Sequence, residues 1–282
     1  MPELPEVETI RMGLEKYLVG HKIVDVEVRL KKMVAGDVGE VRGAKIKGVR
    51  RFGKALSIDL NNGWSIAAHI KLTGQFIYEG PNRPKDAKIS PVQVGQVPGK
   101  HTHVIFELDR GGFLYYNDIR QFGWIKIVPT EDVVKLPFVH ELGPEPLGGL
   151  TLDKFREIVS KSSTKIKPLL MDQKKIGGVG NIYANDALFL ARIDPSRSAK
   201  SLSTNEQSKL YKAIEEVLKK GLKYGGATEM NFVNVLGQPG GYQKYFLVYG
   251  QEGKPCLGKC GGKIQKIRLG GRGTYYCPNC QK

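Results

Sequence analysis

The four cysteines constrain this chain most, because all of them lie within its last 27 residues. They form two pairs, C-x3-C and C-x2-C, at Cys256, Cys260, Cys277 and Cys280. Pairs with this spacing can deliver four thiolates to one tetrahedral Zn²⁺, and the turn formers Gly261 and Pro278 beside them suit two metal-binding knuckles. Two disulfides are the alternative, but no apolar signal segment follows Met1, so we expect a cytosolic protein, in which disulfides are rare. The pattern therefore predicts one structural zinc ion.

The chain is strongly basic, with 44 lysines and arginines against 28 aspartates and glutamates and a formal net charge of +16. Such an excess favours a polyanionic partner, of which nucleic acid is the commonest. Charge alone is equally compatible with a merely soluble basic surface, but small basic zinc modules often bind phosphates. We therefore expect a nucleic-acid-binding protein. No apolar stretch approaches the roughly 20 residues of a membrane-spanning helix, so no membrane partner is expected.

The first half of the chain changes from a helical to a strand period. Residues 5–18 are predicted to form a helix, with Pro5 in its first turn and an apolar stripe along one face. In residues 24–30 apolar and polar side chains alternate, as in a strand with one buried face. Turn signals predict two hairpins, at Asn61-Asn62-Gly63 and Asp109-Arg110-Gly111-Gly112. Residues 1–135 are therefore expected to form a two-layer antiparallel β-sandwich flanked by an N-terminal helix.

The second half is predicted to be helical. Residues 136–149 are rich in proline and glycine and have no sustained period, which predicts a linker. Four helices are expected after it, one capped by Thr151, one capped by Ser203 with Glu206, and two more over residues 167–176 and 182–193. The Gly-rich turn between those two could seat a phosphate on its amides, although such turns usually only reverse the chain. We expect a helical domain over residues 150–236 and a zinc module over residues 237–282.

Four motifs occur in the same order as in formamidopyrimidine-DNA glycosylases. They are MPELPEVET at the start, DIRQFG at 118–123, MDQKKIGGVGNIYANDAL at 171–188 and the C-terminal cysteine quartet. Through these motifs essentially the whole chain resembles this family of bifunctional DNA glycosylases and abasic-site lyases. The C-x3-C pair is one residue longer than the C-x2-C expected there, a spacing that zinc tolerates.

The resemblance implies a fold and an activity. The implied fold is α+β, with an N-terminal antiparallel β-sandwich catalytic domain, a C-terminal helix-two-turn-helix domain and a β-hairpin zinc finger. The implied activity is base-excision repair, in which oxidised purines such as 8-oxoguanine and formamidopyrimidines are removed from duplex DNA and the abasic site is cleaved by β,δ-elimination. A monomer that acts on damaged double-stranded DNA in the cytoplasm, at the nucleoid, is also implied.

Two other functions stay open. The related endonuclease VIII enzymes prefer oxidised pyrimidines, although the Leu4-Pro5 pair favours the purine branch. A non-catalytic, zinc-dependent protein that binds damaged DNA would share several of the motifs. The joint presence of four candidate catalytic residues argues against that binder, namely Pro2, Glu3, Lys54 and Arg272.

Pro2 is the predicted nucleophile. An amine that attacks C1′ of the sugar can release the base and carry the sugar through an iminium, which then eliminates phosphate. A terminal α-amino group has a pKa near ~7.7–8.0, and the positive end of the following helix should lower it further. Met1 must be removed first, because otherwise the Pro2 nitrogen is part of an amide. By residue type alone Pro2 would only start a helix, and the resemblance reverses that interpretation.

The resemblance implies three further catalytic residues. Glu3 would be the proton donor at the deoxyribose ring, and Lys54, on a predicted strand, would be the lysine of β-elimination. Arg272, between the two zinc-binding pairs, would assist δ-elimination and bind the flanking phosphates, for which its planar fork is suited. By residue type alone each of the three could be an ordinary surface charge.

The resemblance also implies a set of DNA contacts. A base inside a duplex must be extruded before it can react, and the gap must be filled by side chains, here Leu72, Arg120 and Phe122. Leu72 stands where many members have methionine. Phosphate contacts are implied for His101 and Asn181, with His69 a weaker candidate because a lone histidine on a strand is more often packed. Residues 225–242 correspond to the flexible Gly-rich segment that folds over the extruded base.

Overall fold

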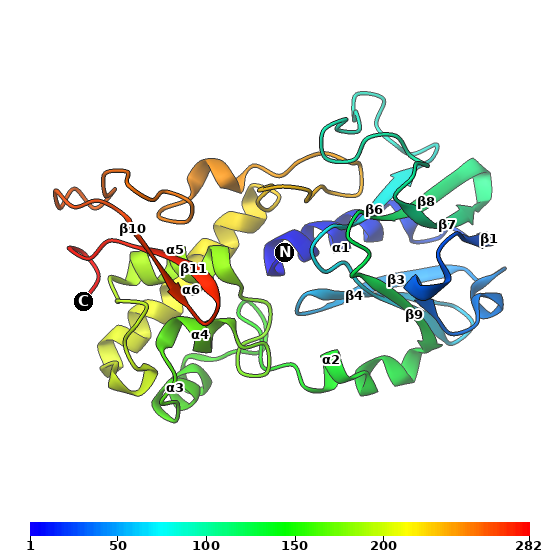
Figure 1. Ribbon diagram of the computed structural model, residues 1–282. Coiled ribbons are helices and arrows are strands. Elements are labelled where there is room, and N and C mark those ends of the chain that lie inside the picture. Colours follow the sequence, from blue (N-terminus) through cyan, green and yellow to red (C-terminus); the bar gives the residue numbers. More distant parts are fainter. The chain divides into compact units, whose positions relative to one another are not determined.

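The computed structural model describes all 282 residues and divides into two compact units (Figure 1). The first unit comprises Met1–His140 and Leu222–Gln243, and the second comprises Glu141–Gly221 and Lys244–Lys282. None of the helices is long and apolar enough to cross a membrane. The chain passes from the first unit to the second between His140 and Glu141, which lies within the predicted linker. It returns to the first unit at Leu222.

The first unit contains one long helix, two β-sheets and several short helical turns. The helices are α1 (Leu4–Leu18) and α2 (Pro137–His140), with the 3-10 turns η1 (Lys31–Met33), η2 (Val38–Val41), η3 (Asp109–Gly111) and η4 (Thr130–Lys135). The strands are β1 (Ile23–Val28), β2 (Val34–Ala35), β3 (Ile46–Phe52), β4 (Ala55–Leu60), β5 (Trp64–His69), β6 (Gly74–Glu79), β7 (Thr102–Leu108), β8 (Gly112–Asp118) and β9 (Trp124–Pro129).

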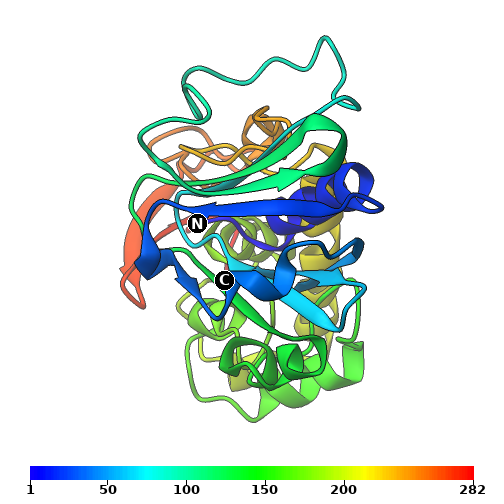
Figure 2. The same ribbon diagram turned by 90° about the vertical axis from the view of Figure 1, so that its right-hand side faces the viewer.

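The strands form the expected β-sandwich. One sheet has the order β1-β7-β8-β6 and the other β2-β9-β5-β4-β3, with antiparallel pairing everywhere except between β2 and β9. The helix α1 lies beside both sheets and contacts β3 and β4 of one and β6 of the other (Figures 1 and 2). Its apolar stripe belongs to the core that both sheets share. Val7, Ile10 and Leu14 on that stripe are at most 1% exposed, which is the burial that the helical period predicts.

Both predicted hairpins are present, but the alternation predicted for residues 24–30 is only partly correct. Residues 61–63 connect β4 to β5, and η3 connects β7 to β8. In β1 a bulge shifts the register against β7 between Ile23 and Asp25. An inserted residue turns the side chains that follow it to the other face, and Val24 is accordingly 49% exposed while Val26 is buried.

The segment Leu222–Gln243 packs on the first unit although it follows the helical part of the sequence. The Val235 carbonyl accepts a hydrogen bond from Tyr78 N at 2.7 Å. On α1, Gly13 leaves room for this segment, since a Cβ there would lie 2.4 Å from Val235 Cγ2. We expected residues 150–236 to form one helical domain, but Leu222–Gln243 belongs to the first unit. The sequence of a Gly-rich segment does not reveal which distant residues it will pack against.

The second unit is mainly helical and carries a β-hairpin. Its elements are α3 (Leu152–Ser160), α4 (Ile166–Met171), α5 (Asn181–Ala191), η5 (Ala199–Ser201), α6 (Thr204–Lys223, which continues past the unit boundary), η6 (Tyr242–Tyr245, likewise across a boundary), β10 (Gln265–Leu269) and β11 (Arg272–Tyr276). The predicted caps are present, because Thr151 Oγ1 accepts from Lys154 N at 3.2 Å and Ser203 N donates to Glu206 Oε2 at 2.8 Å.

The predicted helix over residues 167–176 is wrong in its second half. α4 ends at Met171, and the next residues form a turn in which Asp172 Oδ1 accepts from Lys174 N at 3.0 Å. An aspartate that bonds its own backbone two residues on competes with helix continuation. The charged run after Met171 therefore forms the start of the α4–α5 turn.

Candidate active site and zinc site

The candidate nucleophile and proton donor directly precede α1. Glu3 is the N-cap residue, is 3% exposed, and donates its backbone N–H to Glu6 Oε2 at 2.8 Å. The other oxygen of Glu6 accepts from Ala227 N at 2.7 Å, and Glu6 is 1% exposed. The sequence indicates Glu6 only as a first-turn acid. Its carboxylate instead ties the residue beside Pro2 to the segment Leu222–Gln243.

Lys54 lies in the two-residue turn between β3 and β4, not on a strand as we predicted. Gly53 adopts a φ of 56°, which permits the tight reversal, and Lys54 is 6% exposed. Arg51 donates to Gly53 O at 3.0 Å and to Glu8 Oε2 at 2.8 Å. Since Glu8 belongs to α1, Arg51 holds the Lys54 turn against the helix that follows the N-terminal pair.

His69, the last residue of β5, is half-buried and neutral at physiological pH. Its pKa is lowered to about 3, first by burial and then by the positive charges of Lys71 and Lys54. His69 Nδ1 accepts from Lys71 N at 3.0 Å, so Nε2 carries the proton. His69 can therefore donate a hydrogen bond to a phosphate oxygen only as a neutral imidazole. The effect of Lys54 also shows that these two candidates share one electrostatic environment.

A buried carboxylate that we did not predict organises the three candidate gap-filling residues. Asp118 is 0% exposed and accepts from Thr73 Oγ1, from Arg120 N at 3.2 Å and from Gly123 N at 2.7 Å. Thr73 follows Leu72 in the turn between β5 and β6, whereas Arg120 and Gly123 flank Phe122 in the loop after β8. Asp118 thereby holds the two loops together.

Phe122 is exposed, so it is not a core aromatic residue. It is 54% exposed, and the Arg120 guanidinium lies 4.7 Å from its ring centroid, a cation–π distance. His101 lies beside this group, because its carbonyl accepts from Asp118 N at 3.0 Å. The first unit therefore brings His69, His101 and the three gap-filling candidates to neighbouring positions at one end of its strands.

We expect Asp118→Asn to slow base release while the protein stays folded. The amide keeps one accepting oxygen, but its NH2 group replaces the other carboxylate oxygen, so at least one buried donor loses its partner at a cost of about 1–3 kcal/mol. If half of that cost appears in the reacting complex, excision slows by roughly tenfold or less. Single-turnover excision and thermal melting measure the two effects. The exposed Asp86→Asn provides the same charge change as a control, and equal rates for both variants would contradict the assignment.

The second unit carries Asn181 and Arg272. Asn181 is the first residue of α5, where backbone N–H groups lack helical partners and favour an anion. Arg272 is exposed at the start of β11, after a turn in which Gly270 and Gly271 both have positive φ, 55° and 74°. The hairpin is held by Lys167, a fully buried α4 residue that sequence reasoning missed, whose ammonium donates to Gly273 O at 2.9 Å and to Thr274 Oγ1 at 2.6 Å.

The four cysteines fit one zinc ion and not two disulfides. Their sulfur atoms all lie within 4.8 Å of one another, and all four are free thiols. Cys256 Sγ lies 3.6 Å from Cys280 Sγ, and Cys260 Sγ lies 3.5 Å from Cys277 Sγ. In a tetrahedral site with Zn–S bonds of ~2.3 Å the sulfurs are about 3.8 Å apart. The prediction of one structural zinc ion is thus confirmed in its ligands.

The four thiols affect one another's pKa values because they lie so close together. Two interactions lower the pKa of Cys260 to about 7. The larger is its hydrogen bond with the Cys280 thiol, and the next is a backbone hydrogen bond from Gly262. The same pairing with Cys260, and then burial, raises the pKa of Cys280 to about 12. Without a metal the second thiolate is therefore strongly disfavoured beside the first. A divalent ion removes this repulsion and allows all four sulfurs to ionise.

Comparisons with known proteins agree with this arrangement. The family model described as the formamidopyrimidine-DNA glycosylase N-terminal domain matches residues 1–125, its H2TH domain matches residues 142–232, and a zinc finger found in FPG and IleRS matches residues 253–282. The formamidopyrimidine-DNA glycosylase of Pelotomaculum thermopropionicum is 43% identical, over 100% of this chain and 99% of the relative.

The chain belongs to the formamidopyrimidine-DNA glycosylase family. As a member of this family it is a DNA glycosylase and abasic-site lyase that acts on damaged DNA. A variant of Lactococcus lactis Fpg bound to Fapy-dG containing DNA is 35% identical, with a TM-score of 0.87 over 100% of both chains. Wild-type Lactococcus lactis Fpg bound to oxidised-pyrimidine containing DNA is also 35% identical, with a TM-score of 0.86 over 100% of both chains.

Family membership, the α+β fold and the zinc ligands are thus confirmed, whereas the roles of individual residues in catalysis and DNA contact stay predictions. Pro2, Glu3 and Lys54 belong to the first unit, and Arg272 belongs to the second. The residues that sequence reasoning missed are buried polar groups that hold the candidates in place. Their signal in the sequence is weak, because Glu6, Asp118 and Lys167 are of types that usually lie on the surface.

Proposed function

We propose that the protein is a base-excision repair enzyme that removes oxidised purines, such as 8-oxoguanine and formamidopyrimidines, from duplex DNA. In this proposal the abasic site is then cleaved by β,δ-elimination through a Schiff base on Pro2. One observation carries the proposal. Arg51 links the Lys54 turn to α1, the helix that begins directly after the buried residues Pro2 and Glu3. Pro2, Glu3 and Lys54 are therefore held in one unit.

The first step requires a free secondary amine on Pro2. Met1 must therefore be removed, because in its presence the Pro2 nitrogen is part of an amide and has no free electron pair for attack. The Pro2 nitrogen then donates its electron pair to C1′, and the bond from C1′ to the base breaks with its electrons leaving on the base. Glu3 delivers a proton to the ring oxygen as the C1′–O4′ bond opens, and loss of the Pro2 N–H proton leaves a cationic iminium.

The iminium then drives strand cleavage. Its positive charge acidifies the C2′ proton, and removal of that proton expels the 3′ phosphate in the β-elimination. A second proton loss expels the 5′ phosphate in the δ-elimination. Lys54 is proposed to serve the first elimination and to contact the phosphate beside the lesion, and Arg272 to stabilise the phosphates as they leave, since a guanidinium binds two phosphate oxygens at once.

Base extrusion precedes this chemistry. Unstacking a base costs a few kcal/mol, and the side chains of Leu72, Arg120 and Phe122 are proposed to fill the gap and offset that cost. The exposure of Phe122 and its contact with Arg120 support this role. His69, His101 and Asn181 are proposed to bind the backbone. We also propose that the protein works as a monomer in the cytoplasm, at the nucleoid.

The segment Leu222–Gln243 is proposed to cover the extruded base with its tip alone. Its two flanks are anchored by buried Ala227 and Val233, whereas Met230 between them is 76% exposed. The Gly-rich composition therefore supports local movement of the tip and not of the whole segment. Removal of oxidised pyrimidines is the second candidate function, because the related Lactococcus lactis Fpg has been crystallised with DNA that contains such a lesion.

Kinetics on defined lesions test the proposed substrate class. We expect single-turnover base release from an 8-oxoguanine duplex to be faster than from a matched thymine-glycol duplex by roughly tenfold or more, since a good bidentate contact to a base edge is worth about 1–3 kcal/mol of discrimination. The thymine-glycol duplex also controls for DNA affinity, because both share the same flanking sequence. Faster release of thymine glycol would transfer the assignment to the pyrimidine class.

A further inference from the structure

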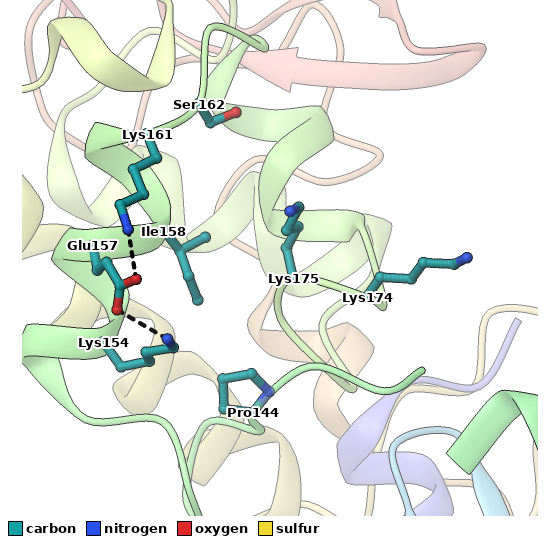
Figure 3. Close-up of a pocket in the computed structure, with 8 residues that line it drawn as sticks. All are labelled: Pro144, Lys154, Glu157, Ile158, Lys161, Ser162, Lys174 and Lys175. Atoms are coloured by element: carbon teal, nitrogen blue, oxygen red, sulfur yellow. Dashed lines mark hydrogen bonds and ion pairs between the residues drawn. The ribbon is translucent and has the colours of Figure 1, made fainter. Parts of the chain in front are cut away.

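The second unit contains a cavity of about 330 Å³ that none of the proposed catalytic residues lines. It lies between α3 and the turn that connects α4 to α5 (Figure 3). The lining residues are Pro144, Lys154, Glu157, Ile158, Lys161, Ser162, Lys174 and Lys175. Its volume is at the lower end of the range of small-ligand sites, so it would accept a small anion or a short length of backbone.

One wall of the cavity is a lysine pair bridged by a glutamate. Glu157 Oε2 accepts from Lys154 Nζ at 2.9 Å, and Glu157 Oε1 accepts from Lys161 Nζ at 2.9 Å. These two hydrogen bonds lower the pKa of Glu157 to about 2, so the carboxylate is ionised at neutral pH. An ammonium group has three N–H donors. Each lysine therefore keeps donors for a ligand while Glu157 holds it at the wall.

The opposite wall carries two further lysines from the α4–α5 turn (Figure 3). Lys174 pairs with Glu141 at 2.9 Å, a residue outside the cavity lining, and Lys175 makes no ion pair. The side chains of Lys154, Lys161 and Lys174 are 50%, 75% and 66% exposed, so their ammonium groups are accessible. The Lys174 side chain extends away from Glu157, which leaves the ammonium groups of Lys154, Lys161 and Lys175 for a ligand in the cavity (Figure 3). Ile158 and Pro144 complete the lining.

We infer that this cavity binds a phosphate-bearing anion. Since Glu141 neutralises Lys174, the other three lysines against Glu157 leave a net charge of about +2, which a single carboxylate ligand would not balance, whereas a pyrophosphate or adjacent phosphodiesters would. Lysine binds phosphate as a compact point charge and does not need the planar geometry of an arginine fork. The phosphate can come from a free polyphosphate or from the backbone of DNA, and in the DNA case the inference rests on the proposed function.

The test compares two double variants of the full-length, zinc-loaded protein. Lys154→Gln with Lys175→Gln removes one ammonium from each wall, and Lys209→Gln with Lys212→Gln removes the same charge from exposed positions of α6 outside the cavity. All four positions are on the surface, where substitutions usually change stability by about 0.5 kcal/mol or less. The probes are pyrophosphate, followed by calorimetry, and a short and a long undamaged duplex, each titrated at several salt concentrations.

Each source gives a different result. For a free polyphosphate, the cavity variant should bind pyrophosphate at least about fivefold more weakly than the α6 variant, with equal DNA binding. If the ligand is DNA, the plot of log binding constant against log salt concentration should be less steep for the cavity variant, by about 0.9 for each lost phosphate contact. Equal behaviour of both variants in every arm would overturn the inference. Borohydride trapping on abasic DNA, run in parallel, reports on Pro2 and so separates a failed inference from a failed function.

Discussion

Replacing Pro2 by glycine in the processed protein is expected to slow strand cleavage at an abasic site by about 10³-fold or more. The proline adduct is an iminium with a fixed positive charge, whereas a glycine amine gives an imine that must first be protonated. Loss of a covalent nucleophile commonly costs this much or more. The measurement is single-turnover cleavage together with borohydride trapping, and mass spectrometry of the trapped product should place the DNA on residue 2.

Two matched proteins show whether the amine itself is responsible. A chain that retains Met1 has the same side chains but an amide at Pro2, and it should form no trapped complex. Pro5→Ala alters the buried proline of the first turn of α1 and leaves the amine intact, so it should still be trapped. Trapping of the Met1-retaining chain at the rate of the processed protein would exclude Pro2 as the nucleophile.

Replacing Cys277 by serine is expected to release the zinc ion and to weaken DNA binding by about 10²-fold or more. Cys277 is fully buried and its sulfur lies 3.5 Å from that of Cys260, so the loss of this thiolate leaves an incomplete site. The free energy of metal binding is what folds a zinc module of this size. Without it the β10–β11 hairpin, which carries Arg272, should lose its order. A chelating dye measures zinc release, and titration with abasic-analogue DNA measures affinity.

The first unit should stay folded in this variant, and its own signal can be followed. Both tryptophans of the chain, Trp64 and Trp124, lie in that unit, so tryptophan fluorescence in urea reports on the β-sandwich alone. Tyr276→Phe is a suitable control, because it changes the neighbouring residue and removes only one hydroxyl. Undiminished DNA affinity in a zinc-free Cys277→Ser protein would exclude a role for the zinc module in binding.

The sequence predicted well whatever depends on near neighbours in the chain. The caps at Thr151 and Ser203, the two hairpin turns and the zinc-binding pairs each involve residues a few positions apart. The errors arose where a local pattern allowed two outcomes. Lys54 was placed on a strand because a two-residue turn barely interrupts the alternation, and residues 172–176 were placed in a helix because Asp172 ends it through its own side chain.

What the sequence by itself determined was the set of reactive groups and the four zinc ligands, along with the short elements that carry them. Only the tertiary structure decided how these groups are supported, because each support joins residues far apart in the chain. Arg51 bonds Glu8 across 43 positions, Arg120 bonds Thr73 across 47, and Ala227 bonds Glu6 across 221. A buried carboxylate or ammonium must find such partners to offset its desolvation, and no local pattern reveals which distant residue will be the partner.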